Sequence, residues 1–454
     1  MKEKVIAIFD IGKTNKKILL FNYNLKLISE SEEKFDQIRD DDGFECDNIE
    51  FIEKWIRETI VKLVRSDKYD LTAVNFTTYG ATLAYLDGNG KRLTPIYNYL
   101  KPIPPNIPAE LYQKYGGLNE FCRRTASPAV GMLNSGLQAL WLKRIKPDVF
   151  NRVRTILHFP QYLSYCLTGK VFSEHTSVGC HTALWDFDNA AYHPWTIDEG
   201  LSLPQPSAIG TLTEVEIEGK KIKIGIGIHD SSASLAPYFA GSQGNFLLAS
   251  TGTWCINMNP FNSEKLTEYQ LSKDCLCYMS ITQQPVKSSR LFLGHFHDTL
   301  SKRLSNYFRL PENNYKKIKP DFELLKTLKG KFKSGKIFFK PEPASREMKE
   351  DIDFSVFKSF EEGYHTLMIE LNDLTVEAIN LVIPSDDKTK NIYITGGFSR
   401  NELFVKMLAA AYPSKKVYTS EIDNATALGT ALVVINSLEP GKKPVLNLGL
   451  KEWK

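Results

Sequence analysis

A polar turn between two apolar runs is the first place where this sequence could do chemistry. Residues 5–21 read VIAIFDIGKTNKKILLF, which predicts a strand, a loop and a returning strand. A tight hairpin would need only two loop residues, whereas this loop offers glycine, hydroxyl, amide and ammonium groups. We therefore expect a loop that binds phosphate through backbone amides, with a longer, solvated hairpin as the alternative. Its candidate binding residues are Gly12, Lys13, Thr14, Asn15, Lys16 and Lys17.

Two aspartates could supply the carboxylate chemistry. Asp10 ends the first apolar run, where a carboxylate needs a cation or solvent to meet it. Asp230 follows His229 and the alternating stretch 221–228 (KIKIGIGI), which predicts another strand. Asp230 could be a catalytic base, but an aspartate at a strand end also commonly caps the next helix. Position alone leaves both interpretations open.

The hairpin plan recurs in the second half of the chain. An apolar run at 246–250 is followed by the polar turn Thr251-Gly252-Thr253 and a returning run at 254–258. Two such hairpins suggest two loops that face each other across a cleft and hold one polyphosphate. A third loop, from Gly396 and Gly397 to Asn401, separates a predicted strand from a predicted helix. Its two glycines would let a flat ligand lie against the backbone.

The elements around these loops follow from hydrophobic periodicity. Apolar residues at helical spacing predict helices over 49–64 and 357–383 and over 402–411. A short apolar run at 71–76 predicts a buried strand that ends in Thr78, Tyr79 and Gly80. Open α/β sheets bind ligands at such carboxyl ends, so these residues are candidate substrate contacts, or else a simple turn. Asn424 is expected to cap a further helix.

Composition limits the class of protein. A chain of 454 residues is too long for one core, so we expect two domains, 1–237 and 238–454. With a net charge of +4 and no basic block, binding to nucleic acid or to a membrane surface is not expected. Seven scattered cysteines indicate reduced thiols, and His295 and His297 indicate packing rather than a metal site. Without a signal-peptide pattern, we expect a cytoplasmic protein.

Together, these motifs resemble those of the FGGY carbohydrate kinases, members of the actin-like ATPase superfamily. The first loop (DIGKTNKK) and the second (STGTW, 250–254) are similar to the family's phosphate motifs. TGGFSRN (395–401) and NATALGTA (424–431) are similar to its adenosine motifs. FPQYLSYCLTGK (159–170), followed by EHTS (174–177), is similar to a long segment of the same enzymes. The His229-Asp230 pair resembles the branch that acts on L-rhamnulose and L-fuculose.

The resemblance implies an α/β protein with two actin-like (ribonuclease H-like) ATPase domains and a cleft between them. It implies transfer of the γ-phosphate of ATP to a hydroxyl of a sugar, a ketose such as L-rhamnulose or L-fuculose. Asp230 would be the general base, and Asp10 and Asp230 would hold Mg²⁺. His229, Thr78, Tyr79 and Gly80 would line the sugar. Alternatives are a pentulose or polyol kinase, or a non-catalytic actin-like ATP-binding protein; a homodimer is also an expectation.

Four departures from the family pattern bear on specificity. Lys13 stands where the family has a small or hydroxylic residue, and Asn98 to Lys101 stands where an Asp-x-Arg is common. The loss of the arginine's bidentate fork indicates that a different hydroxyl pattern is read. LGHFHD (293–298) replaces a ligand-contacting segment, and Phe398 replaces a glycine beside the adenine.

Overall fold

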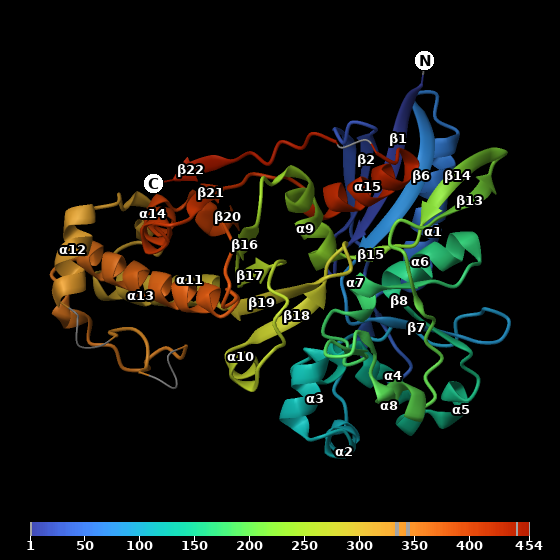
Figure 1. Cartoon of the computed structure of the whole chain (residues 1–454), viewed down its shortest axis with the longest axis horizontal. Coiled ribbons are helices and arrows are strands. Elements are labelled where there is room, and N and C mark those ends of the chain that lie inside the picture. The colour runs from blue at the N-terminus through green and yellow to red at the C-terminus, as the bar shows by residue number, and fades with distance from the viewer. Residues whose placement is uncertain (1, 332–335, 342–345, 442–443, 454) are drawn as a thin grey trace.

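The computed structural model describes residues 2–331, 336–341, 346–441 and 444–453. Two seven-stranded sheets, one from each half of the chain, carry the fold (Figure 1). The first has the order β13-β14-β6-β1-β2-β3, with β15 paired to β6; the second has the order β18-β19-β17-β16-β20-β21-β22. The strands of the first sheet are β1 (Glu3–Ile11), β2 (Lys16–Asn22), β3 (Leu27–Glu33), β6 (Tyr69–Thr78), β13 (Leu212–Ile217), β14 (Lys220–Gly225) and β15 (Ile228–His229). Those of the second are β16 (Phe246–Thr251), β17 (Cys255–Asn259), β18 (Cys275–Met279), β19 (Pro285–Leu291), β20 (Asn391–Gly396), β21 (Lys416–Thr419) and β22 (Lys451–Trp453).

The two sheets share the predicted hairpin plan. In the first, β1 pairs antiparallel with β2 and parallel with β6. In the second, β16 pairs antiparallel with β17 and parallel with β20. Each sheet therefore places one polar hairpin turn beside the carboxyl end of a parallel strand, which is the edge where α/β sheets bind ligands.

Helices cover both faces of the first sheet because its central strands are apolar on both sides. Val5, Ala7 and Phe9 pack with α1 (Ile49–Val64) and α6 (Phe159–Thr168). Ile6 and Ile8 face the other way, toward α15 (Ala425–Leu438) and α9 (Asp230–Gly241). Helix α15 thus comes from the second half of the chain but packs on the first sheet (Figure 1). The division at residue 237 stays a prediction, since α9 runs across it.

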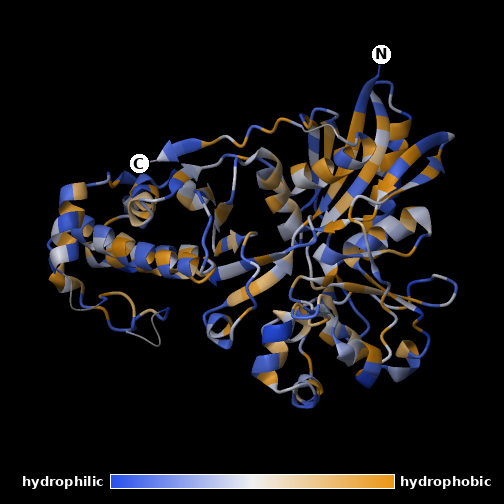
Figure 2. Cartoon of the chain, in the orientation of Figure 1, coloured by the Kyte–Doolittle hydropathy of each residue, from blue (hydrophilic) through white to orange (hydrophobic). Residues whose placement is uncertain are grey.

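The second sheet packs on α11 (Leu293–Tyr307), α13 (Phe360–Asn380) and α14 (Glu402–Ala411). Figure 2 shows hydrophobic and hydrophilic residues alternating along α13, as an amphipathic helix requires. The predicted helices at 49–64 and 402–411 are confirmed, and the predicted helix at 357–383 is shorter by a few residues at each end.

A helical region extends from the first sheet at the lower part of Figure 1. It packs around the antiparallel pair of β7 (Leu83–Leu86) and β8 (Thr155–His158). Its helices are α2 (Asn106–Lys114), α3 (Leu118–Thr125), α4 (Ser135–Ile145), α5 (Pro147–Phe150), α7 (His175–Val178) and α8 (Pro194–Asp198); α10 (Glu268–Ser272) and α12 (Phe322–Lys331) belong to the second half. All seven cysteines are free. None of the described helices is long and apolar enough to cross a membrane.

Candidate active site

The first loop is a closed turn with spare amide donors. Its base is fixed by the pairing of Asp10 with Lys17, and the amide of Gly12 donates to the carbonyl of Asn15 at 2.9 Å. The amides of Lys13, Thr14 and Asn15 donate to no acceptor among the described residues. Three unpaired N–H groups in one turn are the donor set that a phosphate group accepts from.

The lysine side chains of this loop point to a buried aspartate that the sequence did not indicate. Lys16 is only 2% exposed, and its Nζ donates to Asp47 Oδ1 at 2.8 Å and to the carbonyl of Lys13 at 3.0 Å. Lys13 Nζ donates to Asp47 Oδ2 at 2.8 Å. The expectation that both ammonium groups reach a ligand is therefore corrected: they hold the loop from behind.

Tyr79 belongs to the same buried group. Its hydroxyl donates to Asp47 Oδ2 at 2.6 Å, and its ring lies 5.2 Å from Lys13 Nζ. Burial raises the pKa of the Asp47 carboxyl, but Lys13 and Lys16 outweigh it and hold that pKa below its usual value. Tyr79 therefore supports the loop through its hydroxyl, and a contact between Tyr79 and the sugar stays a prediction.

Lys17 links the first loop to the last helix of the chain. Its ammonium donates to Glu30 at 2.7 Å and to Asn424 Oδ1 at 3.4 Å, and the Asn424 amide donates to Glu30 at 2.8 Å. Asn424 has a φ of 51° and its side chain makes no capping hydrogen bond to α15. The prediction that Asn424 caps this helix is wrong, because its side chain is engaged across the boundary between the two halves.

Asp10 and Asp230 lie near one another at the carboxyl ends of two strands that flank β6. Asp10 is the next-to-last residue of β1, and Asp230 opens α9 directly after β15; both strands run parallel to β6. Burial and the charge of Asp230 raise the pKa of Asp10 to about 7. A buried carboxylate beside a second one forms a site that a divalent cation would stabilise, because the cation offsets their repulsion.

His229 orients the Asp230 carboxylate. Its Nδ1 accepts from the amide of Ser231 at 3.2 Å, so a neutral ring carries its proton on Nε2, 3.5 Å from Asp230 Oδ1. Burial lowers the pKa of His229, which favours this neutral form. Asp230 is thus the first residue of α9 rather than its cap, a role that His229 fills.

Two buried residues that sequence reasoning passed over hold this strand end. The carboxylate of Glu174 accepts from the amides of Thr176 and Ser177 at 2.6 and 2.7 Å and from the Thr176 hydroxyl at 2.8 Å. The Thr176 oxygen in turn accepts from the amide of His229 at 3.0 Å. In the sequence, the EHTS motif (174–177) was the only indication of these two residues. In the structure they hold the backbone of His229 in place.

Gly80 leaves room for the ring of His229. The hydroxyl of Thr78, another predicted substrate contact, donates to the carbonyl of Tyr79 at 2.8 Å. A methyl group added at Gly80 would lie 2.6 Å from His229 Nε2. We expect Gly80→Ala to displace the ring and to lower kcat/KM for the acceptor at least about 10-fold, as small-to-large changes in packed sites do. Steady-state kinetics with ADP binding alongside would measure this.

Gly88→Ala is the matched control for Gly80→Ala. A methyl group at Gly88 meets only Arg154 Cγ, at 3.8 Å, which is ordinary contact. Equal kinetics for the two variants would show that the space at Gly80 does not matter to the reaction.

The second loop and the third loop meet at the end of β16. The Thr251 hydroxyl accepts from the amide of Phe398 at 3.0 Å and donates to the carbonyl of Thr395, so it joins the loops instead of facing a ligand. A methyl group at Gly396 would overlap the Thr251 carbonyl, while nothing lies near one at Gly397. Both glycines are exposed, and the close approach of the Thr251 carbonyl requires a glycine at position 396. That Gly396 and Gly397 flank a flat ligand stays a prediction.

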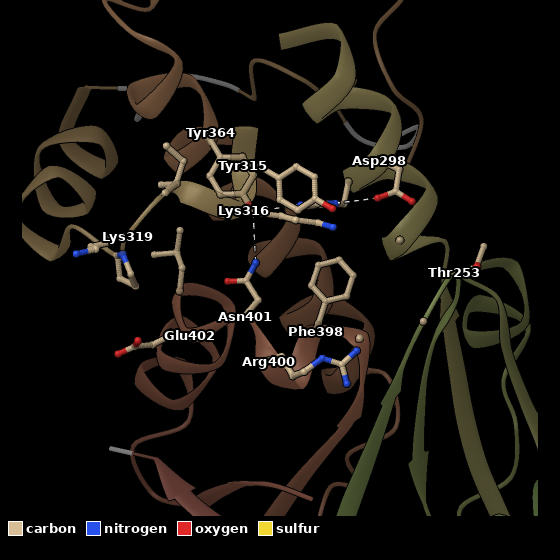
Figure 3. A pocket seen from close by; sticks show the side chains of 17 residues that line it. Thr253, Asp298, Tyr315, Lys316, Lys319, Tyr364, Phe398, Arg400, Asn401 and Glu402 are labelled. Carbon is tan, nitrogen blue, oxygen red and sulfur yellow. Dashed lines mark hydrogen bonds and ion pairs between the residues drawn. The ribbon is translucent and has the colours of Figure 1, made fainter. Parts of the chain in front are cut away.

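A cavity of about 710 Å³ lies beside these loops (Figure 3). Of the predicted ATP-binding residues it includes Gly252, Thr253, Gly397 and Asn401; the first loop does not line it. Of the other lining residues, Gly294, His297 and Asp298 belong to the LGHFHD segment, and Phe398 and Arg400 belong to the TGGFSRN motif. The lining that the sequence did not indicate is Tyr315, Lys316, Ile318, Lys319, Pro320, Tyr364, Glu402 and Leu403. Aromatic rings, amides and an open glycine beside a phosphate-type loop suit a nucleoside.

Comparison with known proteins decides the family. Two models of the FGGY family of carbohydrate kinases match, the N-terminal domain over residues 5–229 and the C-terminal domain over residues 354–436. The chain belongs to the FGGY family of carbohydrate kinases. This FGGY kinase is 22% identical to a rhamnulokinase of Halalkalibacterium halodurans, over 96% of this chain and 95% of the relative. It is therefore a sugar phosphotransferase.

Solved structures agree on the fold of this FGGY kinase. A carbohydrate kinase from Novosphingobium aromaticivorans superposes with a TM-score of 0.79 at 21% identity, covering 100% of this chain and 94% of the other. A ligand-bound xylulose kinase from Lactobacillus acidophilus gives 0.76 at 15% identity, covering 99% and 93%. The predicted two-domain, actin-like α/β fold is confirmed.

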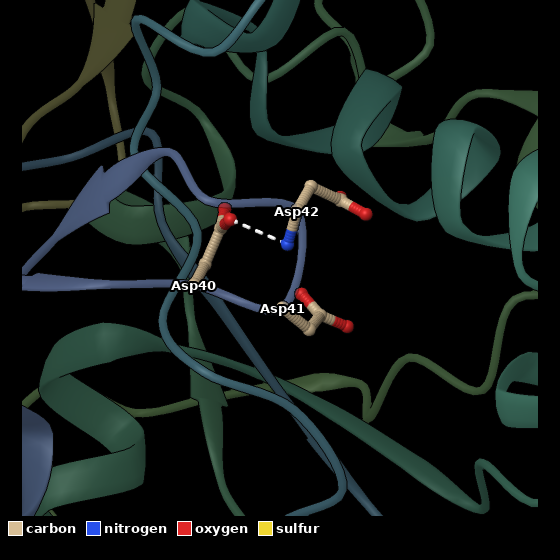
Figure 4. A group of neighbouring side chains, drawn as sticks. All are labelled: Asp40, Asp41 and Asp42. Carbon is tan, nitrogen blue, oxygen red and sulfur yellow. Dashed lines mark hydrogen bonds between the residues drawn. The ribbon is translucent and has the colours of Figure 1, made fainter.

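In this FGGY kinase, the segment Asn98–Lys101 departs from the family pattern, and its lysine contacts an acidic turn formed by Asp40 to Asp42 (Figure 4). Lys101 is 7% exposed and donates to Asp40 at 2.6 Å and also to Asp42. Lys146 binds Asp41 at 2.6 Å and Asp42 at 2.8 Å. The three carboxylates lie close enough to hold a cation, but two ammonium groups already offset most of their charge, so this cluster is structural and Lys101 does not face a sugar.

Proposed function

We propose that this FGGY kinase transfers the γ-phosphate of ATP to a hydroxyl of a ketose, with Asp230 as the general base. The observation that supports this most strongly is the Asp10–Asp230 carboxylate pair at the carboxyl ends of β1 and β15, with His229 fixing Asp230. Phosphoryl transfer needs positioning and charge neutralisation rather than covalent help from the protein. An oriented carboxylate and amide-rich loops meet that need.

In this proposal, different groups of the protein bind the phosphates, bind the nucleoside and accept the proton. The unpaired amides of the first loop and the amide of Thr253 face the phosphates from the two halves, and the large cavity takes the nucleoside. Asp230 Oδ accepts the proton of the acceptor hydroxyl as its oxygen attacks phosphorus. Asp10 and Asp230 would hold Mg²⁺, whose chemistry is to neutralise charge on the phosphate oxygens. Closure of the two halves would exclude water.

The acceptor sugar follows from the His229-Asp230 pair and from the similarity to a rhamnulokinase, which favour L-rhamnulose or L-fuculose. A pentulose or polyol kinase is the second candidate, supported by the likeness to a xylulose kinase structure. Because Lys101 and Asn98 are engaged elsewhere, with Asn98 Nδ2 donating to the carbonyl of Glu45 at 2.9 Å, the usual arginine and acid contacts to a sugar are replaced. A cytoplasmic location and a homodimer remain predictions.

A coupled ADP-release assay over L- and D-ketoses, pentuloses, polyols and aldoses tests this proposal. We expect sugar-dependent ADP release with a ketose, at least about 100-fold above the rate without sugar, and its loss on chelation of divalent metal. Release with aldoses only would overturn the ketose assignment. An absence of sugar-dependent release with every acceptor would favour a non-catalytic ATP-binding protein.

A further inference from the structure

The segment LGHFHD at the start of α11 places two polar residues on the wall of the large cavity. The side chain of His297 is buried, whereas that of Asp298 is 76% exposed and lines the cavity. His297 packs edge-on against Phe398 and Tyr315, with ring centroids 5.3 and 4.7 Å apart. The imidazole is therefore held rigidly beside the one carboxylate that α11 presents to the cavity.

A hydrogen-bonded chain runs from the helix α14 to Asp298, and its direction follows from its two ends. Asn401 Oδ1 accepts from the amide of Phe404 at 3.2 Å, so the Asn401 Nδ2 group points to the Tyr364 hydroxyl, 3.3 Å away (Figure 3). At the other end, His297 Nδ1 lies 3.1 Å from Asp298 Oδ1. A carboxylate only accepts, so Nδ1 carries the proton.

The middle of this hydrogen-bonded chain completes the assignment of its donors and acceptors. Burial lowers the pKa of His297, so the ring is neutral and its Nε2 is an acceptor. The Tyr364 hydroxyl, 3.1 Å from that Nε2, accepts from Asn401 and donates to His297. Each donor thus meets an acceptor, and the helix cap fixes the position of the Asp298 carboxylate. Among the described residues, none donates to Asp298 Oδ2.

The position of Asp298 along α11 relates it to one part of a nucleotide. Gly294 abuts the second phosphate loop so closely that a methyl group there would overlap the Gly252 carbonyl and lie 2.9 Å from Thr253 Cα. Asp298 follows one turn later on the same side of the helix, about 6 Å further along. In Figure 3, Asp298 lies on the side of Thr253, while Lys319 and Glu402 lie on the opposite side of the cavity.

We propose that Asp298 reads the ribose of the bound nucleotide by accepting a hydrogen bond from a ribose hydroxyl through Oδ2. This inference rests on the proposed ATP-dependent function. A nucleotide whose phosphates lie at Gly252 and Thr253 places its ribose one helical turn into the cavity and its base beyond. A carboxylate that can only accept selects a hydroxyl donor there. His297, Tyr364 and Asn401 are positioning residues for that carboxylate.

Calorimetric binding of ADP, 2′-deoxy-ADP and 3′-deoxy-ADP tests the inference without any sugar. We expect the wild type to bind ADP about 10-fold or more tighter than at least one deoxy analogue, the usual effect of a hydrogen bond to a charged group. Asp298→Ala should bind ADP only as tightly as that analogue. Tyr364→Phe, which breaks the chain two groups away, should retain part of the preference.

Glu268→Gln is the control, because this exposed carboxylate does not line the cavity; its ADP-to-deoxy-ADP ratio should equal that of the wild type. Equal binding of ADP and both analogues by the wild type would overturn the inference while leaving the kinase proposal intact. So would an unchanged ratio in Asp298→Ala. A wild type that binds none of the three would overturn the ATP-dependent function itself, and the inference with it.

Discussion

Asp230→Asn lowers the turnover number about 10²–10⁴-fold and leaves the affinity for ADP within about 2-fold of the wild type: this is the expected result, since it is the usual effect of removing a general base. An amide of the same shape keeps the position at the start of α9 but cannot accept the acceptor's proton. In the proposed function ADP binds in the cavity of the second half, whose lining does not include Asp230. Steady-state kinetics and calorimetry on one preparation would separate the two effects.

A control for Asp230→Asn must also remove a carboxylate from the first position of a helix. Glu268 opens α10, is exposed and does not line the large cavity. Glu268→Gln should therefore leave turnover unchanged. If Asp230→Asn retained more than about a tenth of the wild-type turnover, another group would have to accept the proton, and the assignment of Asp230 as the base would be wrong.

Local patterns in the sequence predicted the elements that position the site. Helix α1 and helix α14 were placed because apolar side chains recur at helical spacing, and the two hairpins because apolar runs flank polar turns. These features depend on neighbours in the chain. That Asp10 and Asp230 lie close together agrees with the family resemblance, since the carboxyl ends of parallel strands share one edge of a sheet. Their separate roles stay predictions.

Side-chain partners from distant parts of the chain could not be predicted in this way. Lys16 contacts Asp47, which lies 31 residues away, and Lys17 contacts Asn424, which lies 407 residues away. Both lysines fit the composition of a phosphate loop, but burial of Asp47 beside them gives Lys16 a partner inside the protein. The chain from Asn401 to Asp298 was missed for the same reason, because it joins three helices that only tertiary packing brings together.

Asp47→Asn should destabilise the protein by about 3–5 kcal/mol, the usual cost of removing one partner of a buried ion pair. Asp47 is 5% exposed and accepts from Lys13, Lys16 and Tyr79. The neutral amide would leave two ammonium groups in one buried site without a counter-charge. Because Lys16 also holds the carbonyl of Lys13, the loop should lose its shape and the affinity for ADP should fall as well. Denaturant unfolding and calorimetry would measure the two effects.

Asp40→Asn is the matched control, since its carboxylate is also buried against a lysine, Lys101, but lies outside the first loop. It should lower stability without changing the affinity for ADP. A double variant tests the charge argument directly: Lys13→Met with Asp47→Asn restores a single positive charge to the site, as in the wild type, and should be more stable than Asp47→Asn alone. If the double variant were no more stable, repulsion between Lys13 and Lys16 would not be the cause, and the lost hydrogen bond from Tyr79 would have to account for the destabilisation.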